Sequence, residues 1–247
     1  SALSGNVAVA LPDGRLPSIG GTDAASAVQP LVYAYAPGTG WVLQVSVASP
    51  VQTPFARFGA AVGVSQGQVL VGETPGSLPA DDMVIGTAHV YDAAKNWAAT
   101  QTLTATDSAM GDRFGFAIAA EGDTAVIAAP GKESARGAVY VFTRSAGVWT
   151  AAQKLVIAGD RAEGDFFGHS LALAGDRVLV GAYGRYGQLG AAYLFVRSGE
   201  TWAQTQELTA EVPMAAEVFG GRVALTTEHA LVAGALNIAA GSVEARV

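Results

Sequence analysis

The chain has 247 residues, of which 50% are hydrophobic and 14% charged, so it can bury a core and is not disordered. It contains 31 glycines and 10 prolines but no cysteine, which excludes disulfides, thiolate metal sites and a cysteine nucleophile. Its formal net charge of −7 argues against binding to a phosphate backbone, so we expect no nucleic-acid partner.

The hydropathy pattern argues against a membrane protein. No apolar run approaches the roughly 20 residues that cross a bilayer, so we expect a soluble chain without membrane insertion. The first residues lack the basic and apolar regions of a signal peptide. A mature chain would have lost such a signal, so its absence does not indicate a cytoplasmic protein. The absence of cysteine is compatible with both a cytoplasmic and an exported protein.

A Phe-Gly dipeptide recurs along the chain and marks a repeat. Its phenylalanines are Phe58, Phe114, Phe167 and Phe219, which gives spacings of 56, 53 and 52 residues. Such a period indicates an array of similar structural units. Three further segments follow within each unit at similar offsets, and most are rich in Val, Ala, Leu, Tyr or Phe.

These further segments share recognisable markers. The second segments begin at Gln68, Thr124, Arg177 and Ala230. The third segments open with Gly86, Gly137, Gly190 and Gly241. The fourth segments carry Trp97, Trp149 and Trp202, each four residues before a glutamine, and Trp41 takes this part in the first unit. Short segments separated by Gly, Pro and Asp are typical of strands joined by tight turns.

Two-residue turns join the first two segments of the central units. Gly122-Asp123 and Gly175-Asp176 have the composition of hairpin turns, so the strands they join are antiparallel neighbours. Four antiparallel strands repeated in this way predict an all-β fold, a β-propeller of five four-stranded antiparallel blades. We expect a single domain, residues 1–247, with approximate repeats at 1–50, 51–105, 106–158, 159–210 and 211–247.

The first and last blades are expected to be incomplete in sequence. Residues 1–6 are similar to Leu171–Asp176, which assigns them to the end of a first strand and its turn. Residues 7–12 then become the second strand of the first unit. The fifth unit stops after its third segment. Unpaired edges of this kind attract other strands, so a homo-oligomer through the terminal blades is one expectation.

These residues resemble the FG-GAP repeat family, which also builds the propeller of integrin α-subunits. The best-matching stretches are GDFFGHSLALAGDRVLVGAY at 164–183 and GAAYLFVRSGETWAQTQELTA at 190–210. The resemblance is to the bacterial branch of the family. It implies a β-propeller in an extracellular, periplasmic or cell-surface protein.

Calcium binding is the one family property that the resemblance does not transfer. Integrin-type sites use an Asp-rich loop of the form DxDxDGxxD between the first and second strands. Calcium needs six to eight oxygen ligands, which takes a loop of about nine or more residues. Here the connection is a Gly-Asp pair, so we expect no metal and no cofactor.

Two linking segments contain paired aspartates at the same spacing. Each segment contains the motif Gly-Asp-x-Phe-Gly, and a second aspartate lies five residues before the aspartate of the motif. The two pairs are Asp107 with Asp112 and Asp160 with Asp165. One hypothesis assigns these carboxylates to a cation or to acid/base chemistry. The favoured interpretation is that they accept hydrogen bonds from backbone amides of their own loop and fix the turn.

The histidines and tryptophans favour structural roles. The three histidines lie at non-equivalent positions of different blades, which argues against a shared metal site. His169, Ser170 and Arg222 belong to first strands and are expected to line the central channel. His169 and Ser170 are adjacent on a strand and point to opposite faces, so they do not form a nucleophile and base pair. The tryptophans are expected to pack between outer strands and neighbouring blades.

Loop lengths distinguish the two faces of the propeller. The second-to-third and fourth-to-first connections emerge together, and we call that side the long-loop face. Its second-to-third loops are residues 12–29, 73–85, 130–136 and 183–189. Ligand-binding candidates on it are Asp81, Asp82, Arg136, Arg185 and Tyr186, with Asp13, Arg15 and Asp23 from the longest loop. Variable loops on a rigid frame are where binding functions are concentrated.

Three functions are compatible with the sequence. The favoured one is a noncatalytic binding or interaction module of an exported or cell-surface protein, with a protein or glycan ligand on the long-loop face. The second is a lyase or hydrolase with carboxylates at the channel mouth, which needs titratable groups that converge in one site. The third is a structural or assembly propeller completed by a partner chain.

Overall fold

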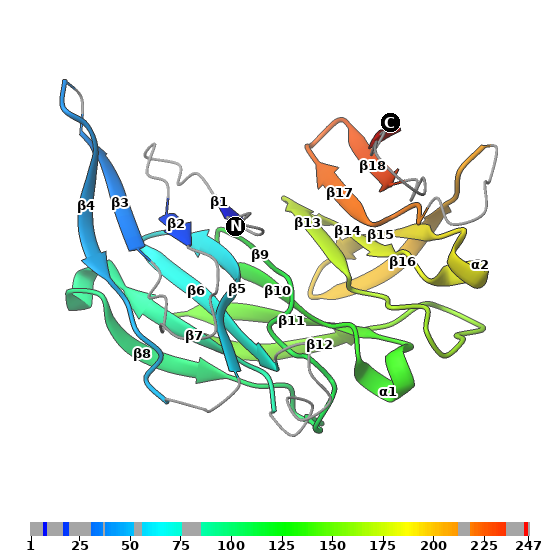
Figure 1. Ribbon diagram of the computed structural model, residues 1–247, viewed down its shortest axis with the longest axis horizontal. Helices are drawn as coiled ribbons and strands as arrows, with labels where there is room; N and C mark the ends of the chain where they lie inside the picture. The colour runs from blue at the N-terminus through cyan, green and yellow to red at the C-terminus, as the bar shows by residue number, and fades with distance from the viewer. Residues whose placement is uncertain are drawn as a thin grey trace, which may run out of the picture.

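The computed structural model is an all-β array of antiparallel sheets (Figure 1). It describes residues 7–8, 17–19, 31–36, 38–51, 56–75, 85–211, 218–235 and 245–246. Within these residues there are four four-stranded sheets and one three-stranded sheet. Each sheet holds consecutive strands in sequence order, as expected for units joined by tight turns.

The strands follow the repeat. The first sheet holds β1 (Val7–Ala8), β2 (Pro17–Ile19), β3 (Leu31–Ala36) and β4 (Gly40–Ser46). The second holds β5 (Ala56–Ser65), β6 (Gln68–Pro75), β7 (Thr87–Asp92) and β8 (Ala98–Leu103). The third holds β9 (Ile118–Glu121), β10 (Thr124–Ala129), β11 (Ala138–Ser145) and β12 (Val148–Leu155). The fourth holds β13 (Ser170–Ala174), β14 (Arg177–Ala182), β15 (Ala191–Ser198) and β16 (Thr201–Leu208). The fifth holds β17 (Arg222–Leu225), β18 (Ala230–Ala235) and β19 (Ala245–Arg246).

The sheets lie beside one another in chain order. The first strands β1, β5, β9, β13 and β17 contact one another in series. In Figure 1 the sheets follow an arc from the blue strands β1–β4 through green to the orange strands β17 and β18. The four-stranded units and their antiparallel order are therefore confirmed.

The first unit differs from its expected assignment. Val7 and Ala8 form the first strand and pair with β2, which lies inside the range expected to be a loop, residues 12–29. The expectation that 7–12 is the second strand is wrong, because strand identity is decided by pairing across the sheet and not by likeness to another unit. Pro17 opens β2, a position where its missing N–H is tolerated.

Two one-turn helical segments interrupt the second-to-third connections. They are α1 (Lys132–Ala135) and α2 (Arg185–Gln188), and a 3₁₀ turn spans Ala93–Lys95. Both α segments contain left-handed residues, with φ of 53° at Glu133 and 54° at Tyr186. They are therefore tight turns of the loops, in the same place in consecutive units, and not regular helices.

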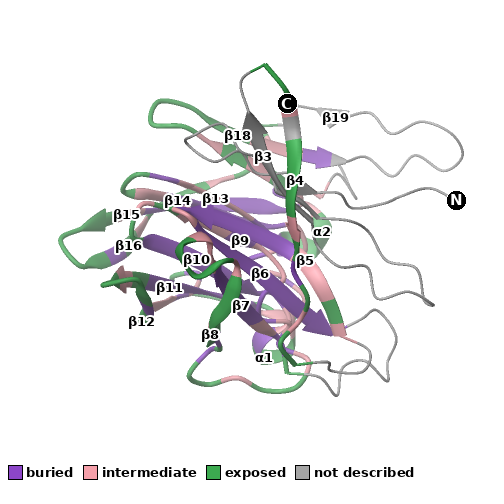
Figure 2. Ribbon diagram, turned by 90° about the vertical axis from the view of Figure 1, so that its left-hand side faces the viewer, coloured by how far each residue is buried: buried purple, intermediate pink, exposed green. Residues whose placement is uncertain are grey.

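The core lies between neighbouring sheets. Figure 2 shows buried residues concentrated along β6, β10 and β14, while the outer strands β8, β12 and β16 carry exposed ones. One buried cluster joins Leu70 and Val90 of the second unit to Phe114 and Ile127 of the third unit. A second cluster joins the third and fourth sheets around Phe167. Burial of these faces against each other provides the main stabilisation of the array.

The Phe-Gly dipeptides are contacts between units. Gly137, which opens the third segment of its unit, forms a parallel β-bridge with Phe167 of the next unit, and Gly190 does the same with Phe219. A Cβ atom at Gly86, Gly137 or Gly190 would lie within 2.1 Å of the carbonyl oxygen of the next unit's phenylalanine. The repeated Gly and Phe-Gly are therefore the two halves of one close backbone contact.

A glutamine on each of the outer strands β8 and β12 bonds to the tryptophan of the next unit. The side-chain amide of Gln153 donates to the carbonyl of Trp202 at 2.7 Å and accepts from its N–H at 2.8 Å. Gln101 makes the same pair of bonds to Trp149, at 2.6 and 2.9 Å. The indoles of Trp149 and Trp202 are buried, so the predicted packing between blades is confirmed for these two.

Replacing Gln153 with leucine is expected to destabilise the fold by about 2 kcal/mol, because it leaves a partly buried N–H and C=O of Trp202 without partners. The control is Gln206→Leu, at the equivalent position of the next unit, where the exposed side chain has no hydrogen bond within the described residues. Urea unfolding of both variants measures the difference. Equal effects of the two substitutions would contradict a role for the amide pair.

Candidate functional site

The linking-segment aspartates fix their own loops. The Asp112 carboxylate accepts a hydrogen bond from the backbone N–H of Ala109 at 2.7 Å, and Asp165 accepts one from Ala162 at 2.8 Å. Both bonds span three residues and close the turn before the Phe-Gly dipeptide. The favoured interpretation of these aspartates is therefore confirmed for Asp112 and Asp165.

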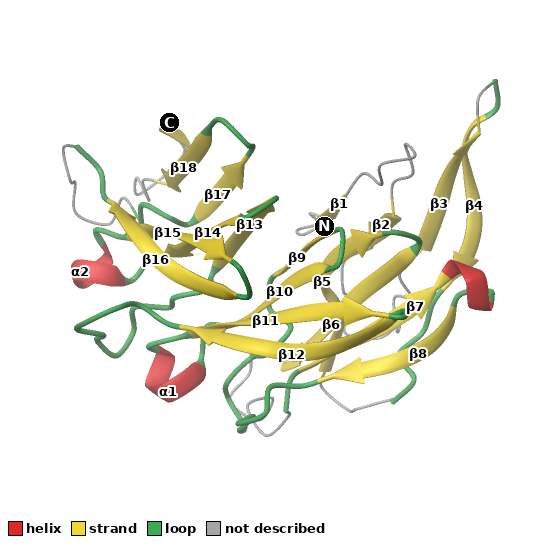
Figure 3. Ribbon diagram, turned by 180° about the vertical axis from the view of Figure 1, so that it is seen from behind, coloured by secondary structure: helices red, strands yellow, loops and turns green. Residues whose placement is uncertain are grey.

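Each of these aspartates also has a buried cation that sequence reasoning missed. Lys132 Nζ lies 2.8 Å from Asp112 Oδ2, and Arg185 Nη1 lies 3.1 Å from Asp165 Oδ2. Lys132 is 7% exposed and Arg185 8%, and they are the first residues of α1 and α2, which are drawn in red in Figure 3. The signal was the common separation of 20 residues in both pairs. Arg185, expected as an exposed ligand-binding charge, instead anchors its loop.

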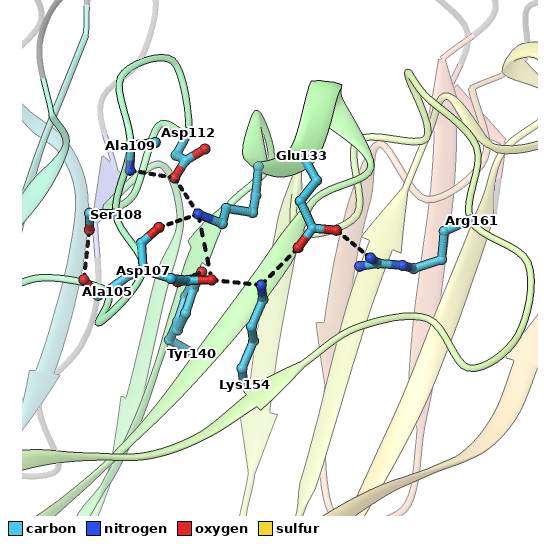
Figure 4. Close-up of polar contacts among 10 residues, drawn as sticks. Ala105, Asp107, Ser108, Ala109, Asp112, Glu133, Tyr140, Lys154 and Arg161 are labelled. Atoms are coloured by element: carbon cyan, nitrogen blue, oxygen red, sulfur yellow. Dashed lines mark hydrogen bonds and ion pairs between the residues drawn. The ribbon is translucent and has the colours of Figure 1, made fainter.

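A larger polar network surrounds Asp107 at the long-loop face (Figure 4). The Tyr140 hydroxyl donates to one carboxylate oxygen of Asp107 at 2.6 Å, and Lys154 donates to the other at 2.8 Å. Lys132 also donates to the Asp107 backbone carbonyl. The network thus joins the linking segment before β9 to β11, β12 and α1.

Glu133 extends this network to the next unit. Its carboxylate accepts from Lys154 at 2.9 Å and from the guanidinium of Arg161, which lies in the segment leading to β13. Figure 4 shows Glu133 between these two cations. The left-handed turn at Glu133 therefore places a carboxylate where it bridges two consecutive units.

The network holds its charges in their ionised forms. Burial raises the pKa of Asp107, but hydrogen bonds from Lys154 and Tyr140 and the charge of Lys132 outweigh it and lower that pKa to about 2. Burial lowers the pKa of Lys154, and its bonds to Asp107 and Glu133 raise it overall. The pKa of the Tyr140 hydroxyl is raised, first by burial and then by Asp107. At neutral pH none of these three groups is poised to exchange a proton.

The lowered pKa of Asp107 predicts a pH-dependent contribution to stability. Its contribution is complete above about pH 4, the ordinary aspartate pKa, and is lost as the pH falls towards about 2. We expect Asp107→Asn to cost at most about 1 kcal/mol at neutral pH, since the carboxylate is partly exposed, and nothing near pH 2.

Urea unfolding across this pH range tests the expectation. Asp160→Asn is the matched control, because Asp160 lies at the equivalent position of the next unit and has no ion pair among the described residues. A cost for Asp107→Asn that stays constant as the pH falls would contradict the assignment.

The same position carries different polar groups in consecutive units. Strand pairing places a titratable ring of the third strand opposite a fourth-strand residue: His89 opposite Thr102, Tyr140 opposite Lys154, and Tyr193 opposite Glu207. In the fourth unit the hydroxyls of Tyr186 and Tyr193 donate to Glu207 Oε1, at 2.8 and 3.0 Å. Lys154 of the third unit is therefore replaced by Glu207 in the fourth, so a carboxylate takes the position of a cation.

The second unit buries a histidine and a glutamate at this position. His89 Nε2 lies 2.7 Å from Glu73 Oε2, and the two side chains are 1% and 5% exposed. Ser49 Oγ donates to the same Glu73 oxygen at 2.7 Å, and His89 Nδ1 lies 3.0 Å from the Thr102 hydroxyl. All the polar atoms named here are paired with one another, which is typical of a structural network.

The predicted channel-lining residues share no hydrogen bond with one another among the described residues. Ser170 Oγ donates to the carbonyl of Gly220 at 2.8 Å, so it joins the fourth sheet to the fifth and has no bond to His169. The His169 ring lies against Phe116 and Tyr183, with centroids 5.2 and 4.4 Å away. Arg222 is exposed and donates to the Gly221 carbonyl.

The remaining long-loop candidates have varied placements. Arg136 is half-buried, bonds to the carbonyls of Arg161 and Glu133, and has Glu163 3.3 Å away. Tyr186 is 50% exposed and lies under the guanidinium of Arg185. The other candidates lie outside the described residues: Asp13, Arg15, Asp23, Asp81 and Asp82.

The described residues contain neither a cluster that could hold a metal ion nor a helix that could cross a membrane. Within the described ranges, no three His, Asp or Glu residues lie close enough together to hold a metal ion. For the same part of the chain, none of the helices has the length and apolarity that crossing a membrane requires.

Comparison with known proteins agrees with the repeat. The model of the FG-GAP repeat matches residues 97–142 and 149–195, each of which spans the fourth strand of one unit and the first three of the next. No curated protein matches the chain significantly. FG-GAP repeats are generally interaction modules, typically without enzymatic activity, and occur mainly in extracellular or surface proteins. The chain therefore contains two segments that match the FG-GAP repeat, which supports the resemblance found in its sequence.

Proposed function

We propose that this chain is a noncatalytic binding module of an exported or cell-surface protein, which engages a protein or glycan ligand through its long-loop face. One observation carries the proposal. A constant backbone frame presents a different, at least partly exposed polar group at the same fourth-strand position of three consecutive units, namely Thr102, Lys154 and Glu207. Constant frames with variable side chains are typical of repeat proteins that recognise ligands.

The proposal includes a five-bladed β-propeller. Its support is the series of contacts between first strands, from β1 through β5, β9 and β13 to β17, with the outer strand of each unit facing away. The glycine and phenylalanine contacts repeat between units with the same polarity, as blades around an axis require. Such an array places the long loops of all units on one side.

The pairing of charges argues for binding and against catalysis. A general acid or base needs a pKa near the working pH and access to substrate. Asp107 and Lys154 are instead held ionised by each other, and Glu73 and His89 are buried together. Carboxylates that are bound to protein partners in this way fix loops and leave recognition to the exposed residues at the edges of the same clusters.

Binding to immobilised polymers tests the proposal. The probes are neutral polysaccharides (dextran, cellulose), acidic polysaccharides (alginate, polygalacturonate) and collagen as an extended protein. We expect retention on at least one probe class, and a weaker interaction for the exposed-face variant Tyr186→Ala. The control Thr100→Ala replaces a similarly exposed side chain of β8 and should bind as the native chain does.

Product analysis of the same incubations separates binding from catalysis. Retention without new reducing ends, unsaturated termini or cleaved protein supports the proposal. Accumulation of any such product would overturn its noncatalytic part. Failure of every probe to be retained would overturn the binding module itself, because the panel covers the ligand classes named here.

A further inference from the structure

Four rings gather near the first strands, between the third and fourth units. Phe166 and Tyr183 are stacked, with centroids 5.0 Å apart and planes inclined by 11°. The Tyr183 ring meets His169 edge to face at 4.4 Å, and His169 lies 5.2 Å from Phe116. We call these four residues the ring patch. All are half-buried, and none belongs to the buried core clusters, so each keeps a solvent-facing part.

The ring patch does not follow the repeat. Phe116 and His169 occupy equivalent positions, which hold Ala60 in the second unit and Gly221 in the fifth. The core phenylalanines Phe114 and Phe167, by contrast, are constant across the same units. Side chains that are large only at one junction are not needed to build a blade, so a requirement other than folding accounts for them.

Polar groups in the ring patch lack protein partners. Within the described residues, neither the Tyr183 hydroxyl nor the His169 ring nitrogens make a hydrogen bond. Half-buried tyrosine and histidine usually pair these atoms, either with protein or with a ligand. They are therefore available to bind hydroxyl groups presented above the rings.

Two arginines give the ring patch a positive charge in an acidic protein. Burial lowers the pKa of His169, and the charge of Arg222 lowers it further. Burial raises the pKa of the Tyr183 hydroxyl, and the charge of Arg113 opposes that rise. Burial first, and then Arg222, lower the pKa of His169 to about 4, so its ring is neutral at neutral pH. The chain as a whole has a net charge of −7, so a local pair of cations beside neutral rings favours a negatively charged ligand.

We propose that the ring patch, with Arg113 and Arg222, binds an anionic sugar, the uronate unit of an acidic polysaccharide. A pyranose has an apolar face that stacks on rings, hydroxyls that suit Tyr183 and His169, and in uronates a carboxylate that pairs with a guanidinium. This inference rests on the proposed function and names its ligand class and its site on the long-loop face, where Phe116 precedes β9 and Tyr183 follows β14.

Calorimetric titration with trigalacturonate tests the site. We expect binding of trigalacturonate, and binding of its neutral analogue α-1,4-galactotriose at least about tenfold weaker, as loss of one charge-assisted contact implies. Arg222→Gln and Tyr183→Ala should each weaken trigalacturonate binding about tenfold. Lys95→Gln, which removes an exposed cation of the second unit, should have no effect.

Two conservative variants keep the test valid if a larger substitution perturbs folding. Tyr183→Phe removes only the hydroxyl, and His169→Phe keeps a ring, so both should fold as the native chain does and bind trigalacturonate more weakly. Melting curves of all variants confirm that the fold is retained.

Several outcomes would overturn the proposal. One is no binding of trigalacturonate. Another is equal binding of polyglutamate with no effect of Tyr183→Ala, which would indicate nonspecific charge attraction. If cellulose, dextran or collagen binds while these variants change nothing, the ring patch proposal fails and the binding module stands. If no probe binds, both fail.

Discussion

Gly137→Ala is expected to destabilise the protein by at least about 4 kcal/mol or to prevent folding. The new Cβ would lie 2.1 Å from the carbonyl oxygen of Phe167 and 2.6 Å from its backbone nitrogen. Neither atom can rotate away, because both belong to the backbone of the next unit. The φ of 81° at Gly137 adds the cost of a left-handed conformation, about 1–2 kcal/mol for an L-residue. Urea or thermal unfolding measures the loss.

Gly147→Ala is the matched control, since Gly147 has the same φ of 81°. A Cβ there would meet only the side-chain nitrogen of Gln68, at 3.9 Å. We expect a loss of about 1–2 kcal/mol, the conformational part alone. If the two alanine variants differ by less than about 1 kcal/mol, the close contact between units is not important for stability.

Glu73→Leu is expected to cost about 3 kcal/mol, because it leaves the buried His89 ring and the half-buried Ser49 hydroxyl without their hydrogen-bond partner, at roughly 1–3 kcal/mol for each group. His89 and Ser49 would both lose their bonds to the Glu73 carboxylate. Glu163→Leu provides the contrast, since its side chain is 66% exposed and its only ion pair among the described residues is to Arg136 at 3.3 Å. We expect that change to cost less than about 0.5 kcal/mol by the same unfolding measurement.

The neighbouring units suggest a compensating variant. At the positions equivalent to Glu73 and His89, the third unit has Ala129 and Tyr140, as its strand register shows. The double variant Glu73→Ala/His89→Tyr should therefore be less destabilised than the sum of its single changes, by at least about 1 kcal/mol. Strict additivity would mean that the two side chains do not stabilise each other.

The strands were predictable from sequence because local pattern determines them. Turns such as Gly122-Asp123 and Gly175-Asp176 and the apolar segments that follow them occur where the structure has hairpins. The first unit was not predictable in this way. Its second strand, β2, begins at a proline and has no repeat marker, so only pairing across the sheet identifies it.

The site was less predictable because its contacts join residues far apart in sequence. The loop-fixing role of Asp112 is local and was expected, whereas its ion pair with Lys132 crosses 20 residues. The bond between Lys154 and Asp107 spans 47 residues. The exposed charge expected at Arg185 is buried for the same reason, since a charge on a loop reveals nothing about the carboxylate it faces in the folded state.

The contacts between units all have the same direction. Gln153 of one unit forms hydrogen bonds with the tryptophan of the next unit. The glycine that opens the third segment of one unit forms a β-bridge with the phenylalanine of the next. An interface with two different halves repeats head to tail without changing its geometry. A duplicated unit inserted between two others would find the matching half on either side. Such a chain can therefore lengthen or shorten during evolution by whole units, because each added unit uses the same interface as the others.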